Sequence, residues 1–135
     1  MNPIEQTIIQ LKTEGLIGKE DIAVACFTAV ITSPDGPQHW ILSANKDRIR
    51  LYDITCRHHA STMYEYGYSG RYKEIPKANI IKAVAGGLFG NCPLTINTNN
   101  MGKIVLGSAA KFYGYLQKEA CASLKKLIKA NFSGK

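Results

Sequence analysis

Seven apolar or alternating segments follow one another between residues 22 and 107, and no helical periodicity separates them. Segments that are rich in β-branched and aromatic residues and bounded by turn residues are typical of β-strands. We predict turns at 33–38 and 45–47 and a loop at 56–61, and the sequence as a whole indicates a mainly β domain. The predicted strands are residues 22–32, 39–44, 48–54, 62–75 with a turn or bulge at Ser69 and Gly70, 79–85, 93–98 and 103–107.

Helical patterns stand at the two ends of the chain. Asn2 is a candidate N-cap, Pro3 suits the first helical position, and apolar residues recur at helical spacing up to Leu11. This helix should end at Gly15 or Gly18. A second helix is predicted near the C-terminus from an apolar stripe of Leu116, Ala120, Leu124, Leu127 and Ile128. Its opposite side should carry Lys118, Lys125 and Lys129.

The length of 135 residues suits one domain, which we take as residues 1–135 with the first helix within 1–18. The chain starts with a polar, acidic segment unlike a signal peptide, and no run of about 18 apolar residues predicts a membrane span. The cysteines are widely spaced and form no CxxC pair, so we expect reduced thiols in a cytoplasmic protein. They are Cys26, Cys56, Cys92 and Cys121.

Charge is unevenly distributed along the chain. Residues 1–70 carry six basic and eight acidic groups, whereas residues 71–135 carry eleven basic groups and two acids, Glu74 and Glu119. A basic half can mark an anionic partner such as lipid headgroups or nucleic acid, but a solvated lysine face is the interpretation we favour. Candidate anion or lipid contacts are Lys46, Arg48, Arg50, Lys118, Lys125, Lys126 and Lys129.

Alternation assigns the faces of two predicted strands. In 48–54, Ile49 and Leu51 should point one way and Arg48, Arg50 and Tyr52 the other. The two arginines could form an anion-binding strip with Lys46, although we favour cross-strand ion pairs with Asp35, Asp53 or Glu65. In 62–68 a stripe of tyrosines could stack nucleic-acid bases, but a core or half-core face is the interpretation we favour; the stripe is Tyr64, Tyr66 and Tyr68.

The segment AGGLFGNCPLTINTNN, residues 85–100, contains a cluster of glycines that raises the question of a phosphate-binding loop. The glycine spacing does not fit GxGxxG, no Gly-Lys-Ser/Thr follows, and the next element is a predicted strand rather than a helix. We therefore predict a wide hairpin corner in which the glycines supply positive φ and Leu88 and Phe89 cap the sheet.

A metal-like cluster is formed in sequence by Cys56, His58 and His59, which Cys92 or His39 could complete. Structural zinc sites usually have paired ligands at both ends, and this cluster has one end, so we favour a surface loop. Nucleophile, base and acid residue types are present, but no spacing among them is diagnostic of catalysis. We expect no enzyme and no cofactor.

Two segments carry a resemblance to a known family. WILSANKDRIRLYDI, residues 40–54, resembles a strand–turn–strand of bacterial pleckstrin-homology domains of the YokE-like and GRAM-like type. The matching positions are Leu42, Ser43, Asn45, Arg48 and Ile49. EIPKANIIKAVAGGLFGNCPLTINTNNMGKIVL, residues 74–106, is similar to the later hairpins of the same group.

The resemblance covers about residues 20–130 and implies a seven-stranded antiparallel, partly open barrel capped by the C-terminal helix, with the N-terminal helix as an addition. Phosphoinositide-binding members carry Lys and Arg around the first hairpin loop, whereas the corresponding SPDGPQ, residues 33–38, holds Asp35 and no basic residue. The resemblance implies a non-enzymatic binding domain but does not specify its ligand, because this scaffold hosts many functions.

We expect such a domain to dock a protein or peptide partner, at a sheet edge or in the groove beside the C-terminal helix. The alternative is peripheral binding to anionic lipid through the basic C-terminal half, and nucleic-acid binding is less favoured. The N-terminal helix could pack on the barrel or mediate a homo-oligomeric contact.

Overall fold

The computed structural model describes residues 2–28, 38–60 and 63–133, and the side chains of these except at 58–60 and 63. Its strands are β1 (Ile22–Thr28), β2 (His39–Asn45), β3 (Arg48–Ala60), β4 (Met63–Pro76), β5 (Ile80–Ala85), β6 (Leu94–Thr98), β7 (Lys103–Gly107), β8 (Lys111–Phe112) and β9 (Tyr115–Leu116). Two α-helices, α1 (Pro3–Thr13) and α2 (Lys118–Asn131), flank them, with a 3-10 turn at Lys77–Asn79. Neither described α-helix has the length and apolarity needed to cross a bilayer.

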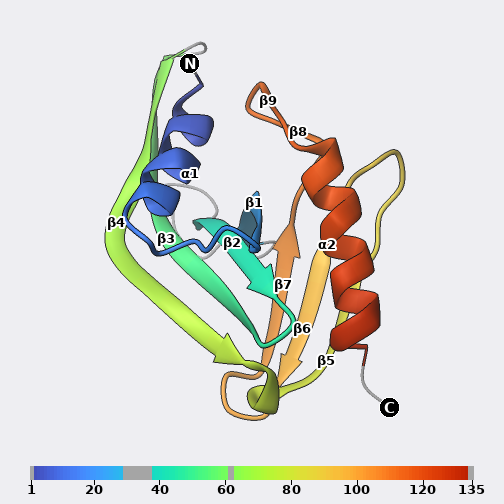
Figure 1. Ribbon diagram of the computed structural model, residues 1–135. Helices are drawn as coiled ribbons and strands as arrows, with labels where there is room; N and C mark the ends of the chain where they lie inside the picture. Colours follow the sequence, from blue (N-terminus) through green and yellow to red (C-terminus); the bar gives the residue numbers. More distant parts are fainter. Residues whose placement is uncertain (1, 29–37, 61–62, 134–135) are drawn as a thin grey trace.

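Seven strands form one antiparallel sheet in the order β4-β3-β2-β1-β7-β6-β5. In the described part of the chain β4 and β5 are the two edges, so the sheet bends strongly without closing into a barrel (Figure 1). The strands β8 and β9 form a separate small hairpin before α2. The mainly β prediction, with seven strands and a helix at each end, is confirmed.

The sheet has an apolar core on each face. On one face α2 packs on residues such as Leu42, Leu51, Leu94 and Leu106 through Cys121, Leu124 and Ile128. On the other face α1 packs through Ile4, Ile8 and Leu11 on Ile41, Tyr52 and Ile54. In Figure 1 α1 accordingly lies against β3 and β4, whereas α2 lies over β5 and also contacts β1.

The predicted strand faces of β3 are confirmed. Ile49 and Leu51 are buried in the core under α2, while Arg50 and Tyr52 lie on the α1 side. The predicted irregularity in β4 is also present. Pairing shifts register between Tyr52 and Ile54 opposite the segment that contains Gly70, which adopts φ 95°.

The loop predicted at 56–61 is wrong in its described part, because β3 continues to Ala60 and pairs with β4. The polar composition of this segment suggested a loop, but pairing with β4 satisfies its backbone hydrogen-bonding groups and continues the strand. The predicted turn at 33–38 and the last residues of the predicted first strand, 29–32, lie outside the described residues except for Gln38.

The N-terminal helix begins as predicted, because the Asn2 side chain caps it by accepting a hydrogen bond from the Ile4 N–H at 2.7 Å. The apolar stripe of the second helix was partly wrong. Leu116 lies in β9 with 74% of its surface exposed, and α2 starts two residues later. A tight turn with positive φ at Tyr113 and Gly114 folds this segment into the β8–β9 hairpin, which keeps Leu116 out of the helix.

Candidate functional site

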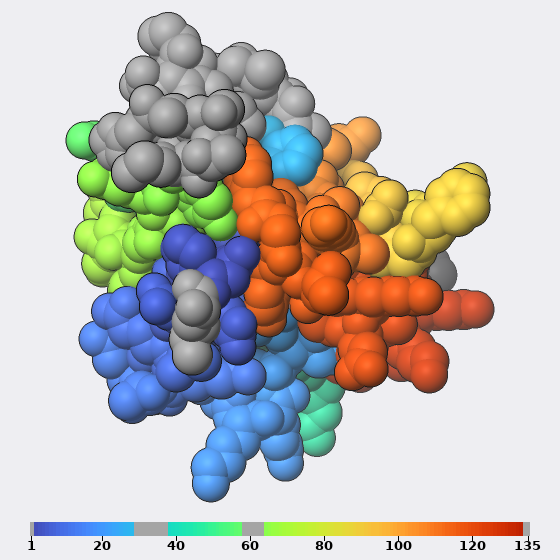
Figure 2. Space-filling model, turned by 90° about the horizontal axis from the view of Figure 1, so that it is seen from above, coloured from blue at the N-terminus to red at the C-terminus, as the bar shows by residue number. Residues whose placement is uncertain are grey.

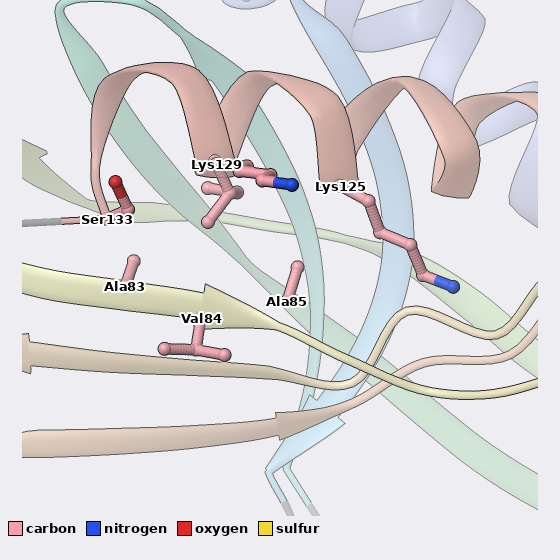
Figure 3. Close-up of a pocket in the computed structure, with 7 residues that line it drawn as sticks. Ala83, Val84, Ala85, Lys125, Lys129 and Ser133 are labelled. Atoms are coloured by element: carbon pink, nitrogen blue, oxygen red, sulfur yellow. The ribbon is translucent and has the colours of Figure 1, made fainter.

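A pocket of about 260 Å³ lies between the edge strand β5 and α2. Figure 3 shows the Ala83 and Ala85 side chains pointing toward the helix and Val84 pointing away from it. From the helix side, Lys129 lies above the space between these alanines and Lys125 points past Ala85 (Figure 3), and both lysines line the pocket. The lining is therefore apolar at its base and basic along one wall, and it consists of Ala83, Val84, Ala85, Lys125, Ile128, Lys129 and Ser133.

The backbone of β5 leaves hydrogen-bonding groups at the edge of the sheet beside this pocket. The Gly86 N–H donates to the Pro93 carbonyl at 2.9 Å, toward β6, whereas the Ala83 N–H donates to the Phe132 carbonyl at 2.6 Å, away from β6. Successive residues of a strand alternate the side to which their N–H and C=O point. The N–H and C=O of Ala85 and the C=O of Ala83 therefore face outward from the sheet edge.

The lysines predicted to share one side of the C-terminal helix do so, and that side is the flank that faces β5 and the following loop. Lys125 donates from Nζ to the Gly87 carbonyl at 3.4 Å. The Lys118 chain lies against Gly90, where an added Cβ would be 3.1 Å from Lys118 Cγ. Lys129 lines the pocket, while the exposed Lys126 lies on the outward side of α2.

The glycine cluster forms the β5–β6 corner, as predicted, with positive φ at Gly87 and Gly90. The predicted capping role of its apolar residues is wrong, because Leu88 is 74% exposed and Phe89 is 94% exposed. Their side chains point into solvent since the loop turns back on itself, with the Asn91 N–H donating to the Leu88 carbonyl at 3.1 Å.

Arg48 and Arg50 form ion pairs, but with acids other than the predicted ones. Arg48 Nη2 lies 2.9 Å from Asp21 Oδ2, and Arg50 Nε lies 2.7 Å from Glu74 Oε1. Asp53 instead pairs with Arg71 at 2.9 Å. Asp35 lies outside the described residues. These acidic partners lie on β4 and in the segment before β1, and strand alternation alone does not predict which acids the arginines reach.

The candidate basic residues therefore lie in two groups. Lys46 lines a separate depression of about 620 Å³ with Arg48 and Asp21, at the β2–β3 turn. Asp21 is only 4% exposed through its side chain, and it accepts from Asn45, Arg48 and the Gly18 N–H. Burial opposes ionisation of Asp21, but these hydrogen bonds and the Arg48 charge outweigh it and hold the pKa below the ordinary value.

Within the described residues, no group of three or more His, Cys, Asp or Glu side chains is placed to hold a metal ion. The side chains of His58 and His59 lie outside that description. Cys56 is half-buried in β3, and burial raises its pKa. The other cysteines are buried, and all four are free thiols.

The tyrosine stripe of β4 is a half-buried face, as predicted. Tyr66 and Tyr68 pack against the core under α1, and Tyr68 lies edge-on to Tyr52 with ring centroids 5.9 Å apart. The Tyr64 hydroxyl donates to the Tyr113 carbonyl at 3.2 Å, which ties β4 to the β8–β9 hairpin.

The chain matches no protein-family model and no curated protein.

Proposed function

We propose that the chain is a non-enzymatic binding module that receives an extended peptide segment of a partner protein in the groove between β5 and α2. The observation that carries this proposal is the outward-facing backbone of Ala83 and Ala85 beside a wall formed by Lys125 and Lys129. An edge strand with such groups is a template for pairing with another chain.

The order of the elements supports a pleckstrin-homology-like scaffold for this module. Seven antiparallel strands precede a C-terminal helix that packs on one face of the bent sheet, and two segments of the sequence resemble that group. The helix α1 is an addition that covers the outer face of β2 and β3. Of the two edges of the sheet, β4 is packed against α1, whereas β5 lies beside α2, so a partner that pairs with β5 approaches on the α2 side.

The chemistry of the groove favours an acidic extended segment. Backbone pairing with Ala85 supplies binding that is independent of sequence, whereas alternate side chains of the added strand would face α2. There they meet the amines of Lys125 and Lys129 and the apolar surface of Ile128. Acidic residues alternating with small apolar ones fit these contacts.

Selection of random linear peptides displayed on phage, with the purified chain as bait, tests this function. We expect enrichment of sequences in which acidic residues recur at every second position. Ala85→Pro deletes the outward N–H at an edge where proline is tolerated, so it should abolish binding of the selected peptides while leaving the thermal unfolding transition in place. Lys129→Glu should weaken binding, and Lys126→Glu, which is matched in charge, should change it little. A failure to enrich peptides, or undiminished binding by Ala85→Pro, would overturn the proposal.

A further inference from the structure

The β5–β6 loop presents two large apolar side chains that make little contact with the rest of the protein. Leu88 and Phe89 are 74% and 94% exposed, and they are adjacent at the tip of the loop. Figure 2, which views the molecule from above, shows this loop in yellow projecting from the body beside the orange-to-red residues of α2. Side chains exposed to this degree contribute little to the stability of the fold.

Phe89 also occupies a backbone conformation that is unfavourable for its residue type. Its φ is 58°, in the left-handed region that glycine or asparagine adopts more readily. An exposed phenylalanine held in strained backbone gains nothing in the folded protein to offset that strain. Its exposure and its backbone conformation together point to an interaction outside the chain.

The loop is held in place rather than left loose. The Gly86 N–H bonds to the Pro93 carbonyl at its base, and the Asn91 side chain accepts from the Ala110 N–H at 2.9 Å. Gly87 cannot carry a side chain here, because a Cβ would lie 2.5 Å from Pro93 Cδ and 2.7 Å from the Asn91 carbonyl oxygen. The shape that presents Leu88 and Phe89 is thus fixed by hydrogen bonds and by a glycine at a required position.

The surroundings of the tip are basic. Lys118 packs along Gly90, and Lys125 donates a hydrogen bond to the Gly87 carbonyl, so two lysines of α2 lie beside the loop. Residues 79–133 contain a single acid, Glu119, and seven lysines, which are Lys82, Lys103, Lys111, Lys118, Lys125, Lys126 and Lys129. Apolar side chains at a projecting tip flanked by Lys118 and Lys125 complement a surface that is negatively charged outside and apolar beneath.

We propose that Leu88 and Phe89 insert into the surface of an anionic membrane while Lys118 and Lys125 contact its headgroups. The source of the negative charge is the lipid bilayer rather than a peptide, because the tip offers apolar side chains and no outward strand edge. This interaction goes beyond the proposed peptide groove, which lies along β5 and uses Lys129 as well as Lys125, whereas Leu88, Phe89 and Lys118 belong to the membrane surface alone.

Flotation with vesicles of phosphatidylcholine, with and without phosphatidylglycerol, tests the proposal. We expect the chain to float with the anionic vesicles at low salt, to lose most of that binding at high salt, and to remain behind with the neutral vesicles. Phe89→Trp should show a blue shift of its emission on anionic vesicles, over the constant background of Trp40. No flotation with anionic vesicles at low salt would overturn the proposal.

Variants separate insertion from simple charge attraction. Leu88→Ser combined with Phe89→Ser should reduce vesicle binding at least tenfold, whereas Ile81→Ser, at an exposed position on β5, should not. Lys118→Glu should reduce it about fivefold or more, and Lys103→Glu, the same change in charge on β7, should reduce it less. Unchanged vesicle binding by the double serine variant would also overturn the proposal. So would analytical sedimentation that shows the wild type as a dimer and the double serine variant as a monomer, because Leu88 and Phe89 would then contact a second copy of the chain.

These variants distinguish the membrane surface from the peptide groove. The double serine variant should still bind selected peptides, and Ala85→Pro should still float with anionic vesicles. Thermal unfolding serves as the control for folding in each case, since Leu88 and Phe89 are exposed and their replacement should not lower the transition temperature.

Discussion

Gln117 completes the sheet at a point where two strands separate. Among the described residues, which leave out 29–37, the strand β1 pairs with β7 at Phe27 and Thr28 alone. At Ala25, the buried Gln117 side chain takes over, accepting from the Ala25 N–H at 2.8 Å and donating to the Ala25 carbonyl at 3.0 Å. A glutamine amide has the donor and acceptor of a backbone peptide group, so it can replace one rung of a ladder.

Gln117→Leu should destabilise the protein by about 2 kcal/mol or more, because the Ala25 N–H would be left buried without a partner. Urea unfolding measures this loss, and Gln10→Leu, on the exposed face of α1, should change stability by about 0.5 kcal/mol or less. An unfolding free energy of Gln117→Leu equal to that of the wild type would show that the amide does not hold the two halves of the sheet together.

Asp21 should make stability depend on acidity. Its folded-state pKa is lowered, so the ionised form stabilises the protein above the unfolded pKa of about 3.9 and this contribution is lost as pH falls through the folded value. Asp21→Asn should therefore be less stable than the wild type at neutral pH, and the difference should shrink below about pH 4. Thermal unfolding across this range measures it, and a difference that stays constant with pH would contradict the assignment.

At the residue scale, the sequence predicted faces better than partners. The alternation of Ile49, Arg50 and Leu51 correctly separated the core from the α1 side. It could not predict that Asp21 would reach Arg48, because that contact depends on how the segment before β1 returns past the β2–β3 turn. Gln117 carried no signal at all, since its role exists only where β7 leaves β1.

Among the elements, the β5–β6 corner shows why a glycine cluster is required without any phosphate. Gly87 has φ 95°, and its Cβ position is filled by Pro93 and by the Asn91 backbone. Gly102 has φ 72° in the β6–β7 turn, but a Cβ there would meet nothing within 4 Å. The two glycines thus share the backbone requirement and differ in the space around them.

Gly102→Ala should cost about 1 kcal/mol, the strain of a left-handed alanine, and Gly87→Ala should cost at least twice as much because the loop must also shift. Chemical denaturation of both variants measures the difference. Equal losses would mean that the corner yields easily, and the fixed presentation of Leu88 and Phe89 would then be without support.

The elements themselves were largely predictable, because strand and helix periodicities differ and the turn residues mark their ends. The errors fell where tertiary pairing overrides composition. The polar segment after Ile54 continues β3 because β4 lies beside it, and Leu116 leaves the helical stripe because the β8–β9 hairpin turns before it. A glycine-rich corner was predicted, but the exposure of its apolar residues requires knowledge of what surrounds it.

In the whole molecule, the peptide groove and the β5–β6 loop tip both lie on the α2 side. Neither surface includes the ion pairs of Arg48 and Arg50. The sheet has apolar cores on both faces, and α1 and α2 cover different ends of it. The basic half of the sequence becomes a flank of α2 beside the open edge of β5, whereas Arg48 at the β2–β3 turn and Arg50 on the α1 side are paired with acids. Net charge along the chain left open an anionic partner or a solvated lysine face, the latter favoured, and only the fold separates the lysines that face outward from the arginines that are paired.

Hydrogen exchange of the Ala85 amide, followed by NMR with and without a peptide selected on the chain, tests the central claim that β5 accepts a further strand. We predict that a saturating peptide slows exchange at Ala85 by at least about tenfold, while Gly86, whose N–H is already bonded to Pro93, changes little. Exchange at Ala85 that is unaltered by a bound peptide would contradict pairing at the β5 edge and place the partner elsewhere on the protein.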